Sequence, residues 1–344
     1  MLLHKLFSAL KSASQSTNIT HRLEHLDNWM ERAAPEGVDA NRYDHTATVK
    51  EYYEICNELM VFGWNESLHF APLTPHESLE DSIIRHQRLM IDKLELQAGM
   101  TVIDVGCGIG GPMRRVVREG GVRVVGINNN EIQMEKAKML NAKAGIDHKV
   151  NYVACSFMDM GVIEDNTFDA GYAIESTCHA PDKEGAYAEI FRVLKPGALF
   201  WCHEMCMTDK FDPNDASHRA IKQELMRSVA LKEIATSGEV EQALEAVGFS
   251  VLEAVDRDIK EGPSTPWYQP METRHGILNS AQYIHRWGRA GLIRVLKLGE
   301  MFRLIPKEPR RIVQFMDRTA KAYVAGGRSG IFTPLYCFLA RKPL

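Results

Sequence analysis

The stretch Asp104-Val105-Gly106-Cys107-Gly108-Ile109-Gly110-Gly111 decides the fold of this chain. It follows a short apolar run at residues 101–105 and opens a segment with helical spacing that continues to about Glu119. Glycines in such a turn let the backbone adopt positive φ and approach a ligand closely. The spacing Gly-x-Gly-x-Gly differs from the Gly-x-Gly-x-x-Gly of dinucleotide-binding turns, which disfavours a nicotinamide-dependent dehydrogenase.

Short apolar runs and helical segments alternate on both sides of this turn. Helices are predicted at 82–96 and 131–144, each beside a predicted strand. This alternation predicts an α/β fold with a doubly wound, mostly parallel, seven-stranded sheet of the Rossmann-like kind. The predicted strands are 101–105, 122–127, 151–154, 169–174, 198–204, 249–255 and 332–340.

Changes in pattern along the chain suggest three parts. Residues 1–80 form an irregular, helical N-terminal region, and residues 81–260 carry the regular strand–helix alternation. Residues 261–344 begin with several prolines, continue with basic helices and return to an apolar run. We expect this last part to form a cap that ends in the last strand of the sheet.

Composition limits the kinds of partner. The chain has 344 residues, of which 45% are apolar, so a sizeable core can form, and its net charge of −4 gives no reason to expect nucleic acid. Its seven cysteines are scattered without a Cys-x-x-Cys pair, which indicates reduced thiols rather than a disulfide framework or a zinc site. We predict no bound metal.

Residues 1–14 have apolar side chains at helical spacing, with Lys and His off that face. A helix on a membrane surface and a helix docked on the protein's own body both fit this pattern. No apolar run is long enough to span a bilayer. We expect a cytoplasmic protein, with peripheral attachment to the endoplasmic reticulum membrane through this helix as the alternative, and the oligomeric state is open.

Polar residues follow the predicted strands at the edge where a ligand of such a sheet binds. Asn128 stands at the end of the second strand, 24 residues after Asp104, where a side chain would bind ribose hydroxyls. Gln133 adds a polar group at the start of the next helix. Each of these alone is more often a helix cap than a ligand, but the glycine turn beside them favours a cofactor site.

Several stretches together resemble the sterol methyltransferase family, whose members are class I S-adenosylmethionine (SAM)-dependent enzymes. They are Gly63-Trp64-Asn65-Glu66-Ser67-Leu68-His69-Phe70, the glycine turn with Pro112, Asn128-Asn129-Asn130, Tyr172-Ala173-Ile174-Glu175-Ser176-Thr177-Cys178-His179-Ala180-Pro181, Phe332-Thr333-Pro334 and Ala340-Arg341-Lys342-Pro343. The glycine turn is shared by many methyltransferases, whereas the first and fourth stretches are far more specific. The resemblance covers roughly residues 50–260 and the C-terminus.

The resemblance implies a role for each matching position. It implies that SAM is the cofactor and that a sterol is the acceptor, with the N-terminal region contributing to the sterol pocket. The implied cofactor-binding residues are Asp104, Gly106, Gly108, Gly110, Asn128, Gln133, Ser156, Phe157 and Ile174. The implied substrate-binding residues are Phe62, Trp64, His69, Phe70 and Tyr172. The implied catalytic residues are Glu175, His179, His203 and Glu204.

Departures from the family's pattern bear on which carbon is methylated. Met60-Val61-Phe62 replaces Tyr-Glu-Tyr, His203-Glu204-Met205 replaces Tyr-Glu-Trp, and Ser156 replaces an acidic residue. Fewer aromatics and carboxylates weaken the case for a pocket that stabilises a carbocation, as C24 methylation requires. Methylation at C4 of a 3-keto sterol proceeds through an enolate, and histidine suits the base. The sequence thus resembles the nematode-type C4-methyltransferases more than the C24 enzymes, which stay the alternative.

Two further functions remain open at this point. A methyltransferase of the same fold that acts on another lipid or natural product would have the same cofactor site. A sterol-binding protein without catalysis would explain the altered pocket and Ser156. The intact glycine turn disfavours the second of these, because a pure binding module has no physical need for it.

Overall fold

The computed structural model describes residues 48–53, 66–258, 265–272, 286–305 and 307–344, together with His21 and Glu24. The predicted N-terminal helix and the predicted substrate residues Phe62 and Trp64 lie outside these residues. The chain forms two compact units. The sheet unit comprises Glu66–Lys210, Ile234–Thr265 and Phe332–Leu344, and the helical unit comprises Met1–Asn65, Phe211–Glu233 and Pro266–Ile331. The division at residues 80 and 260 stays a prediction.

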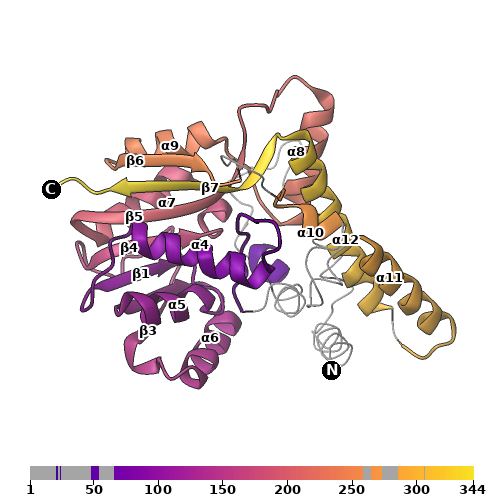
Figure 1. The fold of residues 1–344 in the computed structure, drawn as a ribbon, viewed down its shortest axis with the longest axis horizontal. Helices are drawn as coiled ribbons and strands as arrows, with labels where there is room; N and C mark the ends of the chain where they lie inside the picture. The colour runs from indigo at the N-terminus through magenta and orange to yellow at the C-terminus, as the bar shows by residue number, and fades with distance from the viewer. Residues whose placement is uncertain are drawn as a thin grey trace. The chain divides into compact units, whose positions relative to one another are not determined.

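A seven-stranded sheet forms the centre of the sheet unit (Figure 1), in the order β3-β2-β1-β4-β5-β7-β6. The first five strands pair in parallel, and β7 runs antiparallel to both β5 and β6. The prediction of a doubly wound, mostly parallel sheet is therefore confirmed. The strands are β1 (Thr101–Val105), β2 (Arg123–Asn128), β3 (Val150–Ala154), β4 (Phe168–Ile174), β5 (Leu194–Met207), β6 (Ser250–Asp256) and β7 (Phe332–Arg341).

Helices cover both faces of this sheet, and each face has its own apolar core. On one face α4 and α5 bury Met90, Val116 and Trp201, and on the other α7 and α9 bury Tyr187 and Leu244. The apolar area removed from water on both faces is the main stabilising contribution to such a layered fold. The helices of this unit are α4 (Leu79–Lys93), α5 (Gly111–Gly120), α6 (Glu131–Lys143), α7 (Lys183–Val193) and α9 (Ser237–Ala246), with short 3₁₀ turns η2 (Asp147–Lys149) and η3 (Thr177–His179).

Strand β7 lies between β5 and β6, although it follows both in the sequence. Nearly all of its residues are buried, which fits an almost continuous run of apolar and small side chains. In the β5–β7 register, Cys337 lies opposite His203. The last strand therefore brings residues from the end of the chain beside the carboxyl ends of the parallel strands.

Helix α12 (Glu308–Ser329) is the longest described helix of the helical unit and packs on three further helices. Aromatic rings fill the contacts inside this unit, where the ring centroids of Trp267 and Tyr323 lie 6.0 Å apart. An ion pair from Arg289 to Asp317, at 2.8 Å, joins α11 to α12. The other helices are α8 (Ala216–Ser228), α10 (Gln269–Glu272) and α11 (Arg286–Met301).

Candidate active site

The glycine turn connects β1 to α5 through left-handed backbone. Gly106, Gly108 and Gly110 have φ values of 79°, 51° and 75°. A Cβ at Gly106 would lie 2.4 Å from the Cβ of Ser176, so a larger residue would collide with the loop that follows β4. A Cβ at Gly108 would meet nothing within 4 Å, which leaves open space beside the turn. The turn therefore has the shape that a closely approaching ligand needs.

Asp104 lies near the end of β1 and is almost completely buried. Its carboxylate accepts a hydrogen bond of 2.8 Å from the hydroxyl of Tyr172, its partner in the β1–β4 register. Desolvation raises the pKa of Asp104 to about 7, and the hydrogen bond from Tyr172 opposes this shift. The structure thus places Tyr172 among the predicted cofactor residues, with its hydroxyl on Asp104, and its contact with substrate stays a prediction.

Asn128 and Gln133 hold each other in place at the carboxyl end of β2. The Asn128 amide donates a hydrogen bond of 3.0 Å to the side-chain oxygen of Gln133, and its own oxygen accepts from the backbone N–H of Asn130. Asn130 in turn caps α6, because its side chain accepts from the backbone N–H of Gln133. An amide oriented in this way offers both a donor and an acceptor for sugar hydroxyls.

The remaining predicted cofactor residues follow β3 and β4. Ser156 and Phe157 are half-buried just beyond β3, and Ile174 is the last residue of β4. Because β1 to β4 are parallel neighbours, their carboxyl ends share one edge of the sheet with Asp104 and Asn128. The structure therefore brings the cofactor residues predicted from separate segments to a single edge.

Glu175 follows β4 directly and has left-handed backbone with a φ of 50°, which is uncommon for a residue with a side chain. Its backbone N–H donates to the carbonyl of His203, and its carboxyl accepts from the backbone N–H of Phe70 at 2.6 Å. Desolvation raises the pKa of Glu175 to about 8, partly opposed by the hydrogen bond from Phe70. At neutral pH this buried carboxyl therefore carries its proton, and its strained backbone is typical of a functional site.

His69 is buried beside Glu175 as a neutral imidazole. Its Nδ1 donates to the carbonyl oxygen of Phe70 at 2.6 Å, so its Nε2 is an acceptor, and the side-chain amide of Gln87 donates to it at 2.9 Å. Desolvation lowers the pKa of His69 to about 4. Of the predicted substrate residues, Phe70 thus contacts the predicted catalytic residue Glu175 through its backbone N–H, while a ligand atom of His69 lies within 4.8 Å of the Glu175 carboxyl.

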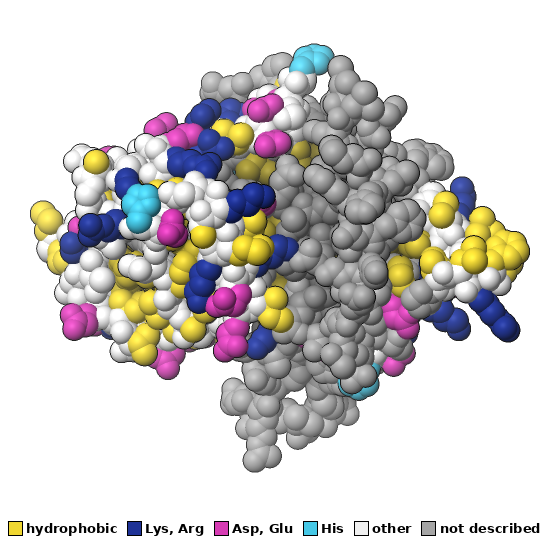
Figure 2. Space-filling model, turned by 90° about the horizontal axis from the view of Figure 1, so that it is seen from below, with side chains coloured by type: hydrophobic (Ala, Val, Ile, Leu, Met, Phe, Trp, Pro, Cys, Tyr) yellow, Lys and Arg dark blue, Asp and Glu magenta, His cyan; other side chains and the backbone are white. Residues whose placement is uncertain are grey.

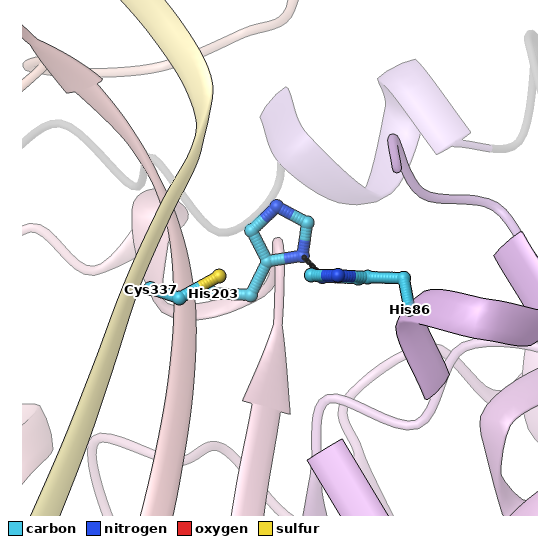
Figure 3. A group of neighbouring side chains, drawn as sticks. All are labelled: His86, His203 and Cys337. Atoms are coloured by element: carbon cyan, nitrogen blue, oxygen red, sulfur yellow. Dashed lines mark hydrogen bonds between the residues drawn. The ribbon is translucent and has the colours of Figure 1, made fainter. Parts of the chain in front are cut away.

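Figure 3 shows His203 on β5 with the ring of His86 from α4 next to it and the thiol of Cys337 on its other side. His203 Nε2 donates to the carbonyl of Pro334 at 2.5 Å, so its Nδ1 accepts from His86 Nε2 at 3.4 Å. Desolvation lowers the pKa of His203 to about 3 and that of His86 well below its usual value. His203 Nε2 lies 3.8 Å from the Glu175 carboxyl, but because both groups are neutral this contact is no ion pair.

Two sets of side chains have the composition of a metal site. His86, His203 and Cys337 form one set, and His69, Glu175 and His203 form the other. The hydrogen bonds to Pro334 and His86 already occupy both nitrogens of His203. Burial also raises the pKa of the Cys337 thiol, which disfavours the thiolate that binds metals. Both sets consist of neutral groups, although the Nδ1 of His86 is buried without a hydrogen-bond partner among the described residues. The prediction of no metal stays a prediction.

The structure does not bring Glu204 into this histidine group. Successive strand residues point to opposite faces, so Glu204 faces away from His203. It is fully buried and accepts hydrogen bonds from Thr177 at 2.5 Å, Tyr187 at 3.0 Å and Lys183 at 3.1 Å. Desolvation lowers the pKa of Lys183, but the charge of Glu204 and smaller contributions from the neighbouring cysteines together outweigh it, so the net shift is upward. Glu204 therefore anchors the loop after β4, and a catalytic role for it stays a prediction.

His179 lies four residues beyond Glu175, at the end of η3. It is half-buried, and its backbone N–H donates to the carbonyl of Ser176. Among the described residues, the set whose ligand atoms lie within 4.8 Å of one another contains Glu175, His203 and His69 rather than His179. Its catalytic role stays a prediction.

Sequence reasoning missed the contributions of α4 and β7 to this group. His86 and Gln87 are buried on the inward face of α4, and Pro334 supplies the carbonyl that orients His203. Two adjacent polar residues on the apolar face of a predicted helix are a signal that could have been noticed. The part played by Pro334 has no such signal, because it depends on the pairing of β7 with β5.

The chain matches known methyltransferases in sequence. Residues 103–202 match the model of a methyltransferase domain, and residues 281–344 match that of the sterol methyltransferase C-terminal domain. The chain is 43% identical over 305 residues to cycloartenol-C-24-methyltransferase of Arabidopsis thaliana, covering 89% of this chain and 90% of that protein. It is 35% identical over 343 residues to sterol 24-C-methyltransferase of Saccharomyces cerevisiae, covering 98% and 89%.

Solved structures with the same fold are more distant in sequence. The cyclopropane synthase MmaA2 from Mycobacterium tuberculosis matches with a TM-score of 0.66 at 16% identity, covering 88% of this chain and all of that one. Geranyl diphosphate C-methyltransferase from Streptomyces coelicolor, solved with S-adenosyl-L-homocysteine, matches with a TM-score of 0.61 at 17% identity, covering 89% and 100%. These likenesses confirm the fold.

Proposed function

The chain belongs to the sterol methyltransferase family, and we propose that it methylates C24 of a sterol whose side chain carries an alkene. It is a SAM-dependent sterol C-methyltransferase, given the methyltransferase domain and the sterol methyltransferases to which it is similar over most of its length. The position is our proposal. It rests on the 43% identity to a relative that is named for C24 methylation.

The side chains at the carboxyl ends of the parallel strands fit the cofactor. The turn at Gly108 is open where a ligand approaches, and the amide of Asn128 is oriented for ribose hydroxyls. Asp104 lies beside the turn with Tyr172 holding its carboxylate. SAM supplies an electrophilic methyl group, so the protein has to align the acceptor and exclude water rather than activate a nucleophilic side chain.

Glu175 is suited to the charge that C24 methylation creates. When C24 takes the methyl group, the neighbouring side-chain carbon becomes positively charged until a proton leaves. A positive charge next to a buried carboxyl lowers its pKa, so with a sulfonium cofactor bound nearby Glu175 would give its own proton to water and be a carboxylate. That carboxylate would stabilise the cation and then accept the proton that leaves the sterol side chain. The hydrogen bond from Phe70 N–H fixes the carboxyl for this role.

Methylation at C4 is the second candidate, and one observation favours it. His203 is a neutral imidazole within 3.8 Å of Glu175, and neutral histidine is a suitable base for forming an enolate. Against it, the hydrogen bonds to Pro334 and His86 occupy both of its nitrogens. The departures at residues 60–65 that favoured C4 lie outside the described residues, and the nematode-type resemblance stays a prediction.

The test is to incubate the full-length protein with methyl-labelled SAM and each of two acceptors, then to locate the label by mass spectrometry. One acceptor is a Δ24 sterol such as cycloartenol, and the other is a 3-keto sterol with a free C4. We expect label on C24 of the first and none on the second. Label on C4 would overturn the proposal in favour of the enolate route. Cofactor binding without transfer to either would show that the acceptor is a different one.

A further inference from the structure

A cluster of exposed hydrophobic side chains marks the end of α11. Ten large hydrophobic residues are strongly exposed in the described part of the chain, and five of them lie between positions 295 and 304. Leu298 is 53% exposed, Phe302 65% and Leu304 77%. In Figure 2 hydrophobic side chains gather at the far right, where α11 and the turn after it lie, with Lys and Arg beside them. We call this set the α11 patch; its members are Val295, Leu298, Met301, Phe302 and Leu304.

The α11 patch is not the face through which α11 packs on the core of the helical unit. The other side of α11 is already packed, because Leu296 is 2% exposed and Arg289 is buried in an ion pair with Asp317 of α12. Val295, Leu298 and Phe302 are spaced three and four residues apart and therefore share one face of the helix and its final turn. Exposed apolar groups gathered in this way indicate an interaction surface.

The charge around the α11 patch points to the kind of partner. Residues 286–311 contain eight Lys and Arg against two Glu, a balance of +6 within a chain whose net charge is −4. Of the two acids, Glu300 is paired with Arg310. Arg294, Lys297 and Arg303 are exposed beside the patch, and none has a carboxylate partner among the residues that the structure describes. Apolar side chains bordered by unpaired cations fit an anionic surface with an apolar interior.

We propose that the α11 patch docks the enzyme on the surface of an anionic phospholipid membrane. The hydrophobic side chains enter the boundary between headgroups and acyl chains, while Arg294, Lys297 and Arg303 contact lipid phosphates. The helices within the described residues are too short or too polar to cross a bilayer, so this contact is peripheral. A second copy of the chain is a poorer occupant, because two such patches would bring like charges together. Docking here is independent of which sterol carbon is methylated.

Vesicle sedimentation of the full-length protein tests this proposal. The patch variant is Leu298→Ser/Phe302→Ser/Leu304→Ser, and the matched control is Met139→Ser/Val162→Ser/Leu252→Ser, which removes three equally exposed hydrophobic side chains from the sheet unit. On vesicles of phosphatidylcholine with phosphatidylserine, we expect the affinity of the patch variant to fall roughly tenfold to hundredfold, since binding scales with buried apolar area. The control variant should bind like the wild type.

A charge variant separates the two components of the surface. Arg294→Ser/Lys297→Ser/Arg303→Ser should weaken binding to the anionic vesicles and leave binding to phosphatidylcholine alone unchanged. Wild-type binding in the patch variant, or an equal loss in the control, would overturn the proposal. So would a patch variant that changes the oligomeric state in sedimentation velocity while vesicle binding is unchanged. Loss of binding only on substituting Leu3 and Leu6 would instead assign docking to the helix predicted from the sequence at residues 1–14. Sterol turnover in detergent should be the same in all these variants.

Discussion

His203 and Glu204 are neighbours on β5 and both are fully buried, yet their electrostatic surroundings on the two faces of the strand differ. On one face the Glu204 carboxylate is matched by the Lys183 ammonium and by the hydroxyls of Thr177 and Tyr187. On the other face His203 joins His86 and Glu175 in a group that holds no compensating charge and stays neutral at pH 7. A buried polar group is therefore kept charged on one face and uncharged on the other.

The difference indicates that one face of β5 stabilises the loop after β4, whereas the other carries groups suited to a reaction. The Lys183–Glu204 ion pair, with all its hydrogen bonds made, holds its loop in one geometry, and a charge forming elsewhere does not change its protonation state. Neutral groups with strongly shifted pKa values respond to any charge that forms next to them, which is what a reacting centre requires. The loop from Glu175 to Lys183 is held by the first face and presents Glu175 to the second.

Removing the charge of Glu204 should have the largest effect. In Glu204→Gln the Lys183 ammonium is buried without a counter-charge, and we expect the free energy of unfolding to fall by about 3–5 kcal/mol. Urea denaturation measures this value. The matched control is Lys195→Gln, which breaks a half-exposed pair with Asp169 and should cost less than about 1 kcal/mol. Equal losses in the two variants would mean that the Lys183–Glu204 pair is no more important than a surface pair.

Glu175→Gln should come next and should affect catalysis rather than folding. The amide still accepts the hydrogen bond from Phe70 N–H, but it cannot become a carboxylate beside a cation. We expect kcat with a Δ24 sterol to fall by about 10²–10³-fold, as for the loss of one electrostatic stabiliser. Affinity for SAM, measured by calorimetry, should be unchanged. A kcat close to that of the wild type would remove Glu175 from the reaction.

The pH dependence of stability should show a smaller effect of the same substitution. The folded pKa of Glu175 is raised to about 8, so the folded protein keeps a proton that the unfolded chain releases above its ordinary value of 4.5. Stability is therefore lost as the pH rises from 4.5 towards 8. Glu175→Gln abolishes this loss and should be more stable than the wild type at pH 6 by roughly 2 kcal/mol, with a difference that grows further towards pH 8, and about equally stable at pH 4.

Thermal melts of both proteins between pH 4 and pH 8 measure that difference. Burial lowers the pKa values of His69 and His203, so both proteins lose stability as the pH falls below 6.5. This loss is common to the two proteins and cancels in the comparison. A difference in melting temperature that does not change with pH would mean that Glu175 is already ionised in the folded state.

The sequence was sufficient to predict the fold and the cofactor edge. The observed strands begin and end close to the predicted ranges. Strands of a parallel sheet are buried on both faces, so each appears in the sequence as a short apolar run between amphipathic helices. The predicted cofactor residues come together for a related reason. Most of them lie at or just beyond the carboxyl end of a strand, and the carboxyl ends of neighbouring parallel strands meet at one edge. Their contact with the cofactor stays a prediction.

The cluster of buried residues around Glu175 was only partly predictable. Glu175, His69 and His203 were identified, and the structure brings them together. His86 was missed. The family resemblance implied a catalytic role for both His203 and Glu204, but strand alternation puts them on opposite faces of β5. Protonation states were also beyond the sequence, because they depend on how completely each group is buried.

The position of β7 has a consequence for how the protein reaches its active form. During synthesis β5 and β6 emerge long before the strand that must lie between them, so each exposes an unpaired edge until β7 arrives. Pairing over such a sequence separation is slow, and open edges invite wrong partners in the meantime. The carbonyl of Pro334, which orients His203, comes with that same strand. The nascent chain therefore cannot assemble the group around His203 before β7 is inserted between β5 and β6. A chain that stops before Phe332 lacks both β7 and the carbonyl that orients His203.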